Sequence, residues 1–226
     1  MENVTSLTQL LFVVATFITV ILLYIASNKN NFVLGLVLIW LTIQAILGIA
    51  GFYENTTSIP PRLIFMLIPT VIIMIFLFNS KKGKTYIDAI NLKYLTLLHA
   101  VRILVEIILM QLFIANTVPQ VMTFEGRNYD ILSGISALVI FYFGYVKHKL
   151  NKNIILAWNI ICLLLVINVV LYGILSAPSI LQKLNFDQPN IAVLHFPFVW
   201  LASFIVPVVV FAHLVAIRRI LVASSL

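Results

Sequence analysis

Charged residues are scarce in this chain. Asp, Glu, Lys and Arg together make up 9% of the sequence, whereas apolar residues make up 62% and the mean hydropathy is +1.13. Soluble domains carry roughly a quarter charged residues, so this composition excludes an ordinary soluble domain. We predict an all-α fold: a polytopic integral membrane protein with a single transmembrane helical domain over residues 1–226, placed in the cell membrane as a multi-pass protein.

Cysteine and acidic residues are also few. The one cysteine, Cys162, lies inside an apolar run, which excludes an internal disulfide and a cysteine-based metal site. Seven acidic residues stand against fourteen basic ones, for a net charge of +7. The basic residues are spread through short loops instead of forming one basic domain, so we expect the lipid bilayer and not nucleic acid as a partner. The oligomeric state stays open.

Long apolar runs, by contrast, are frequent. Runs of about 17 to 25 residues have the length of a membrane-crossing helix. No basic residue precedes the first run, which predicts a retained first span and not a cleaved signal peptide. The predicted seven transmembrane helices cover residues 9–27, 32–53, 63–79, 94–115, 131–146, 154–176 and 196–217.

The distribution of Lys and Arg predicts the orientation of these spans. Loops on the cytoplasmic side of membrane proteins are enriched in basic residues. Alternate loops hold ten on one side and three on the other, with Arg102 inside a span. The N-terminus is therefore predicted outside and the C-terminus inside. The ten are Lys29, Lys81, Lys82, Lys84, Lys93, Lys147, Lys149, Lys152, Arg218 and Arg219; the three are Arg62, Arg127 and Lys183.

Spans one to three and five to seven share features that suggest a 3+1+3 parallel repeat. The second span of each half carries a tryptophan, Trp40 or Trp158, and the third a proline, Pro69 or Pro207. This plan resembles that of the SWEET sugar transporters, whose halves are parallel repeats. The resemblance is in topology only, and it implies a transport function and no particular residue roles.

The fourth span is the only predicted span that contains charged side chains, Arg102 and Glu106, and it also contains His99. At about 100° per residue all three project from one stripe of a helix. A charged side chain at the centre of a membrane helix costs roughly 2.5 to 3.5 kcal/mol on insertion scales, so such a stripe faces other helices or a water-filled cavity. We therefore expect the fourth span to be central.

Depth along the spans sorts the polar residues into two layers, at about 1.5 Å per residue. Two interpretations are open: a path for a solute or proton in which Arg102 and Glu106 change partners, or a fixed Arg102–Glu106 pair with amides holding the bundle together. The inner layer contains His99, Arg102, Asn159, His213 and Tyr145 or Tyr142, and the outer layer contains Glu106, Asn168, Gln44 and the group of Asp130, Ser133 and Ser136.

No cofactor or metal is expected. His195 and His213 are 18 residues apart along one predicted helix, about 27 Å, and cannot share an ion. A site between His99 and His213 stays open. The seventh span has no lysine for a retinal Schiff base.

The loop before the fifth span holds Glu125, Arg127 and Asp130. These residues predict either an outer rim of a solute path, with Arg127 available for an anionic group, or a turn in which Asp130 caps the helix and pairs with Arg127.

No catalytic or nucleotide-binding motif appears in the chain. The favoured function is therefore transport of a small solute or proton, with the polar site on the fourth span. The alternatives are a membrane-embedded enzyme that acts on a lipid and an accessory or structural membrane subunit.

Overall fold

The protein is seen in a computed structural model that describes residue 1 and residues 3–224. Within these residues every regular element is helical, which confirms the all-α prediction. The principal helices are α1 (Ser6–Ala26), α2 (Asn31–Ile49), α3 (Ile64–Asn79), α4 (Lys81–Ala89), α5 (Leu92–Leu98), α6 (Val101–Ile114), α7 (Asp130–Ile140), α8 (Lys152–Ser176) and α9 (Val206–Ser224).

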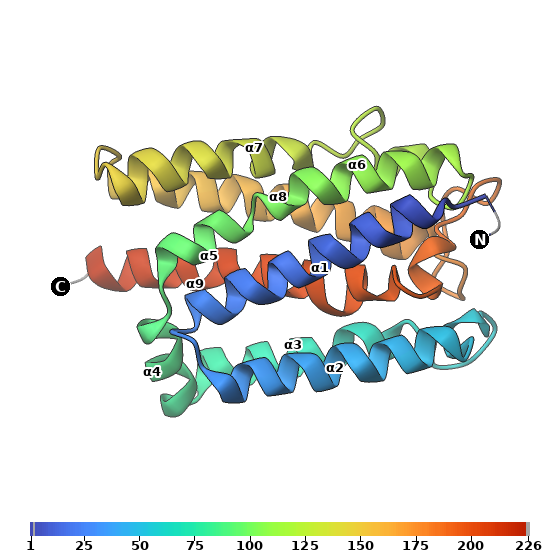
Figure 1. Cartoon of the computed structure of the whole chain (residues 1–226), viewed down its shortest axis with the longest axis horizontal. Coiled ribbons are helices and arrows are strands. Elements are labelled where there is room, and N and C mark those ends of the chain that lie inside the picture. The colour runs from blue at the N-terminus through green and yellow to red at the C-terminus, as the bar shows by residue number, and fades with distance from the viewer. Residues whose placement is uncertain (2, 225–226) are drawn as a thin grey trace.

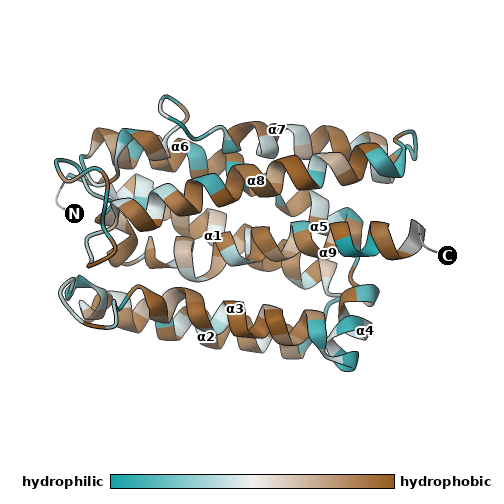
Figure 2. Ribbon diagram, turned by 180° about the vertical axis from the view of Figure 1, so that it is seen from behind, coloured by the Kyte–Doolittle hydropathy of each residue, from teal (hydrophilic) through white to brown (hydrophobic). Residues whose placement is uncertain are grey.

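Most of these helices run along one common direction (Figure 1). Helices α7 and α8 form one side of the bundle, α1 and α9 run through its middle, and α2 and α3 form the opposite side. The two termini lie at opposite ends of the long axis. Hydrophobic residues occupy most of the length of the helices, and hydrophilic residues gather at α4 and at the loops (Figure 2).

Among the described residues, five helical stretches are long and apolar enough to cross a membrane, or six if α3 and α4 count as one bent span. The seven spans predicted from the sequence are not all reproduced. The fifth predicted span is a shorter apolar helix, α7 continued by the π-helical turn η3 (Phe141–Val146). The third is the 16-residue α3, after which the chain turns by 92° into α4. These helices are nevertheless compatible with a membrane protein.

The fourth predicted span is made of α5 and α6, with a break at His99 and Ala100. Here the bonds Arg102 N–H to His99 carbonyl and Ile103 N–H to Ala100 carbonyl are of the i to i+3 type, typical of a tightened turn. Half of this span is buried, as is half of the span that contains α9, and α2 is the least buried at 17%. The fourth span is thus among the most buried, as the polar stripe predicted.

Helix α7 packs unusually closely on α6. A Cβ added at Gly134 would lie 2.9 Å from the backbone nitrogen of Ile103 and 2.8 Å from its Cγ1. Ser133 and Ala137 flank this glycine and are fully buried. Small residues at such positions let two helix backbones approach, and here the approach holds the first turn of α7 beside Arg102.

Two tryptophan side chains form hydrogen bonds between α2 and the start of the last span. The Trp40 indole N–H donates to the Ser203 carbonyl at 2.8 Å, and the Trp200 indole N–H donates to the Leu41 carbonyl at 2.9 Å. Ser203 belongs to the π-helical turn η5 (Leu201–Ile205).

The two halves of the chain, predicted as parallel repeats, differ in their third span. Helix α3 passes at once into the bent α4, whereas α9 runs on from Pro207 to Ser224.

Candidate polar site in the bundle core

Arg102 is the centre of a buried polar cluster. It lies in the first turn of α6, and its side chain is among the largest fully buried ones in the described chain. Its Nε donates to Asp130 Oδ2 at 2.6 Å and its Nη2 to Asp130 Oδ1. Such a bidentate arginine–carboxylate pair is the strong form of ion pair. The Nη2 atom also donates to the Cys162 carbonyl of α8 at 3.2 Å.

His213 of α9 extends the cluster to a fourth helix. Its Nε2 lies 3.0 Å from Arg102 Nη1, and its Nδ1 lies 2.9 Å from Asn159 Oδ1. A guanidinium only donates, so Nε2 is the acceptor and the ring is the neutral tautomer with its proton on Nδ1. Asn159 in turn donates through Nδ2 to the Ile155 carbonyl at 2.8 Å. The three donor and acceptor roles are mutually consistent.

His99 lies at the break between α5 and α6 and stacks on His213. The ring centroids are 3.9 Å apart with 16° between the planes, and the Trp158 ring closes the side at 5.5 Å from each imidazole. His99 Nδ1 is buried without a hydrogen-bond partner among the described residues. The structure thus brings together four residues of the predicted inner layer, His99, Arg102, Asn159 and His213.

The contacts of His213 argue against a metal site between His99 and His213. Both nitrogens of His213 already face protein partners, which leaves the ring no lone pair for an ion. No group of three or more His, Cys, Asp or Glu side chains with metal-binding geometry occurs in the described part of the chain.

The fixed Arg102–Glu106 pair, one of the two interpretations that the sequence left open, was wrong. The ion pair of Arg102 is with Asp130, and both Glu106 oxygens accept from the Asn128 amide nitrogen at 2.7 Å. The reason is the loop before α7, which folds back over α6. It brings an acid to the arginine and an amide to Glu106. No Arg102–Glu106 ion pair is present among the described residues.

Asn128 connects the two carboxylates. Its Oδ1 accepts the backbone N–H of Asp130 at 2.9 Å, and its Nδ2 also donates to the Met122 carbonyl at 2.9 Å. The side chain is fully buried. The sequence analysis missed this residue, although an Asn two positions before an Asp at a helix start is a recognisable side-chain-to-backbone turn signal.

The predicted outer rim does not form as one group. Asp130 is buried and belongs to the core cluster, whereas Glu125 and Arg127 are exposed. Arg127 donates to the Tyr172 hydroxyl at 3.3 Å and not to Asp130. The predicted Asp130–Arg127 turn was therefore wrong, because the stronger partner of Asp130 is Arg102 on the neighbouring helix.

The predicted outer layer is likewise dispersed. Gln44 accepts the Tyr53 hydroxyl at 2.6 Å, and Asn168 donates to the Arg127 carbonyl at 3.0 Å. Neither joins Glu106, because equal depth along two helices does not make their side chains face each other.

Neither of the two cavities described here borders Glu106 or Arg102. One, of about 70 Å³, is an apolar pocket between α3, α8 and η5 near Met122. The other, of about 250 Å³, lies at the turn between α1 and α2. Arg102, Glu106 and Asp130 are buried in this conformation.

The comparisons with curated proteins and with solved structures gave no match. Residues 59–221 match the family described as Domain of unknown function (DUF8737). The matched range contains Glu106, Asn128 and Asp130 with the rest of the polar core. Since the match covers more than half of the sequence, the chain belongs to this family.

Proposed function

We propose that the protein is a multi-pass membrane protein with seven crossings, its N-terminus outside and its C-terminus in the cytoplasm. In this proposal α7 with η3 is the short fifth crossing and α3 the short third. Ten basic residues on one side and three on the other support the orientation. Termini at opposite ends of the bundle support an odd number of crossings (Figure 1).

Cysteine labelling tests this topology. The single native cysteine is buried in α8, so Cys162→Ser gives a cysteine-free background. Single cysteines at Lys82 and Lys149 should react with an impermeant reagent only after the membrane is opened, and a cysteine at Glu125 should react in intact cells. Labelling of Lys82→Cys from outside would contradict the orientation.

We further propose that the polar core carries a proton in transport of a small solute. The observation that carries this proposal is the charge balance of the buried cluster. The cluster holds two buried carboxyl groups, Asp130 and Glu106, but one buried guanidinium, and Arg102 is bound in a bidentate pair to Asp130. Glu106 is left with an amide partner alone. A buried acid without a cation is the group best suited to take up and release a proton.

Transport also requires the buried core to open on each side in turn. Irregular backbone adjoins the cluster at two places: the break at His99 and Ala100, and the π turn η5 followed by Pro207. Transporters place interrupted helices around a central site. In this proposal the conformation seen is closed to both sides, and α9 carries His213 away from Arg102 when the core opens.

The test is proton movement in liposomes. Purified protein is reconstituted around a pH-sensitive dye, and pools of sugars, amino acids, carboxylates and cations are added outside. One pool should move protons with the wild type, and Glu106→Gln should abolish the signal while its unfolding temperature changes little. Asp187→Asn, an exposed acid in the last loop, is the matched control. Full transport by Glu106→Gln would contradict the proposal.

A lipid-handling function is the second candidate, because the apolar pocket between α3 and α8 has the character of an alkyl-chain site. Its lining holds one polar side chain, Asn190, which donates to the Gly173 carbonyl at 3.3 Å. No acid, His or Cys lines it, so the pocket favours lipid binding over lipid chemistry. Gly173→Leu, which would meet Met122 Cε and Asn190 Nδ2, fills the pocket and should abolish co-purifying lipid if this candidate is right.

A further inference from the structure

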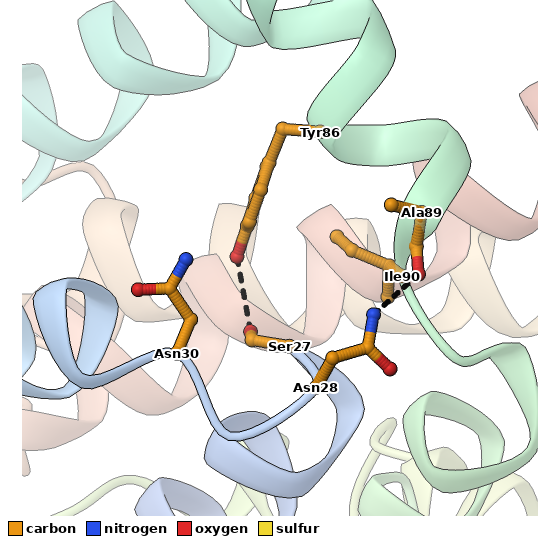
Figure 3. A pocket seen from close by; sticks show the side chains of 6 residues that line it. All are labelled: Ser27, Asn28, Asn30, Tyr86, Ala89 and Ile90. Carbon is orange, nitrogen blue, oxygen red and sulfur yellow. Dashed lines mark hydrogen bonds between the residues drawn. The ribbon is translucent and has the colours of Figure 1, made fainter.

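The larger cavity lies at the basic end of the bundle. The turn between α1 and α2 supplies Ser27, Asn28 and Asn30 to its wall, and the end of α4 supplies Tyr86 and Ala89 (Figure 3). Ile90 completes the lining, and the volume is about 250 Å³. This space is far larger than a single water needs.

The wall of this cavity is rich in uncharged polar groups. The Ser27 and Tyr86 hydroxyls are 3.0 Å apart, and Asn28 Nδ2 donates to the Ala89 carbonyl at 2.7 Å. Asn30 uses its Oδ1 to cap α2 at Phe32 and Val33. Its Nδ2 has no hydrogen-bond partner within the described chain and points toward the Tyr86 side in Figure 3. The wall offers donors and contains no carboxylate.

The two elements that form the cavity also carry four lysines. Lys29 stands in the turn itself, and Lys81, Lys82 and Lys84 stand on α4, all four exposed. The one acid of α4, Asp88, is engaged by Arg218 at 3.3 Å. An uncharged donor pocket within a lysine cluster is suited to an anion and not to a cation.

The position of α4 indicates what kind of anion. Helix α4 leaves α3 at 92°, buries Gly83 and Ile87, and exposes its lysines. A helix of this kind lies along the membrane surface at headgroup depth. Directly beside the cavity α2 begins, and its side chains Phe32 and Leu36 are 74% and 52% exposed. The polar cavity proposed for a headgroup thus lies next to an apolar surface on α2 that suits acyl chains.

We propose that the cavity between the α1–α2 turn and α4 binds the headgroup of an anionic phospholipid of the cytoplasmic leaflet, with the acyl chains along α2. This inference rests on the proposed membrane orientation and is independent of the transport proposal. The phosphate is held by the lysines of α4 and Lys29, and the glycerol or headgroup hydroxyls by Asn30 and the Ser27–Tyr86 pair.

The experiment measures lipid binding to the detergent-purified full chain. Phosphatidylglycerol and phosphatidylcholine with identical acyl chains are titrated, with retention read by native mass spectrometry and stability by thermal unfolding. Phosphatidylglycerol should bind several-fold more tightly and raise the unfolding temperature more. The triple variant Lys81→Gln, Lys82→Gln, Lys84→Gln should bind both lipids equally.

A second experiment blocks the cavity with a substitution that leaves the charge unchanged. Ala89→Trp fills the space and should remove the preference, whereas Thr85→Trp, an exposed position on α4 outside the lining, should keep it. Equal binding of the two lipids by the wild type, or an unchanged preference in Ala89→Trp, would overturn the proposal. So would competition by inorganic phosphate at lipid concentrations, which would indicate a site for the free anion. Cysteine labelling at Lys82 and Lys149 in the Cys162→Ser background shows separately whether the membrane orientation stands.

Discussion

The amide nitrogen of Asn128 lies 2.7 Å from each carboxylate oxygen of Glu106. Asn128 also accepts the backbone N–H of Asp130. A change in the charge of Glu106 therefore alters the hydrogen bonds of a residue that holds the start of α7, where Asp130 binds Arg102. The loop before α7 therefore links the two buried acids. The structural contribution of this loop can be measured separately from that of the Arg102–Asp130 ion pair.

Removing Asn128 should destabilise the protein. Asn128→Ala leaves Glu106 and the Met122 carbonyl buried without this donor, at a cost of about 1–3 kcal/mol for unsatisfied groups. Thermal unfolding in detergent measures this loss. Combining the change with Glu106→Leu should restore part of the stability, and a double mutant as unstable as the sum of the singles would contradict the coupling.

Breaking the Arg102–Asp130 pair should cost more. Asp130→Asn leaves a buried guanidinium without its carboxylate, which costs about 3–5 kcal/mol. Arg102→Met with Asp130→Leu should recover most of this loss because both charges are removed. The matched comparison is Arg102→Met with Glu106→Gln, which should show no mutual rescue. If that second cycle rescued instead, Glu106 and not Asp130 would be the partner of Arg102.

The close contact of α6 and α7 should be intolerant of a single methyl group. Gly134→Ala places a Cβ 2.9 Å from the Ile103 backbone nitrogen, and overpacking of this kind costs about 1–3 kcal/mol. Gly35→Ala is the control, since a Cβ there meets nothing within 4 Å and helix propensity favours alanine by up to about 1 kcal/mol. Equal unfolding temperatures for the two variants would show that α6 and α7 are further apart.

The stability should also fall in mild acid because of His195. Burial lowers the pKa of His195 below its ordinary value of 6.5, and the nearby Glu54, at 3.3 Å, opposes this shift in part. The unfolded chain thus binds a proton more readily than the folded one, so stability is full above pH 6.5 and is lost as the pH falls through the window below it. His195→Gln should flatten the unfolding temperature between about pH 7 and pH 5, and Glu54→Gln should steepen it. A wild-type profile that rises in acid would have the wrong sign.

The inner polar layer could be predicted because His99, Arg102, Asn159 and His213 are fixed by helical spacing and depth, two quantities that apolar runs provide. The partner of Arg102 could not, since it depends on how the loop over residues 116–129 folds back onto α6. Depth alone misplaced Gln44, because it does not determine how a helix is rotated about its axis.

The backbone irregularities also escaped the sequence reading. The break at His99 and Ala100 has no glycine or proline to mark it, and it arises where a ring stack and a buried arginine meet. The bend at Ser80 stands in what reads as a basic loop, yet Ser80 caps α4 by accepting the Gly83 N–H at 3.0 Å.

The bend of α4 also bears on which membrane suits this protein. Helix α3 has 16 residues, about 24 Å at 1.5 Å per residue, and α4 fixes its end at the interface by turning along the surface. A typical hydrocarbon core is about 30 Å thick. In the proposed topology α3 is shorter than the hydrocarbon core, so the bilayer beside α3 becomes thinner. Hydrophobic mismatch then draws the protein to thinner membranes or short-chain lipids.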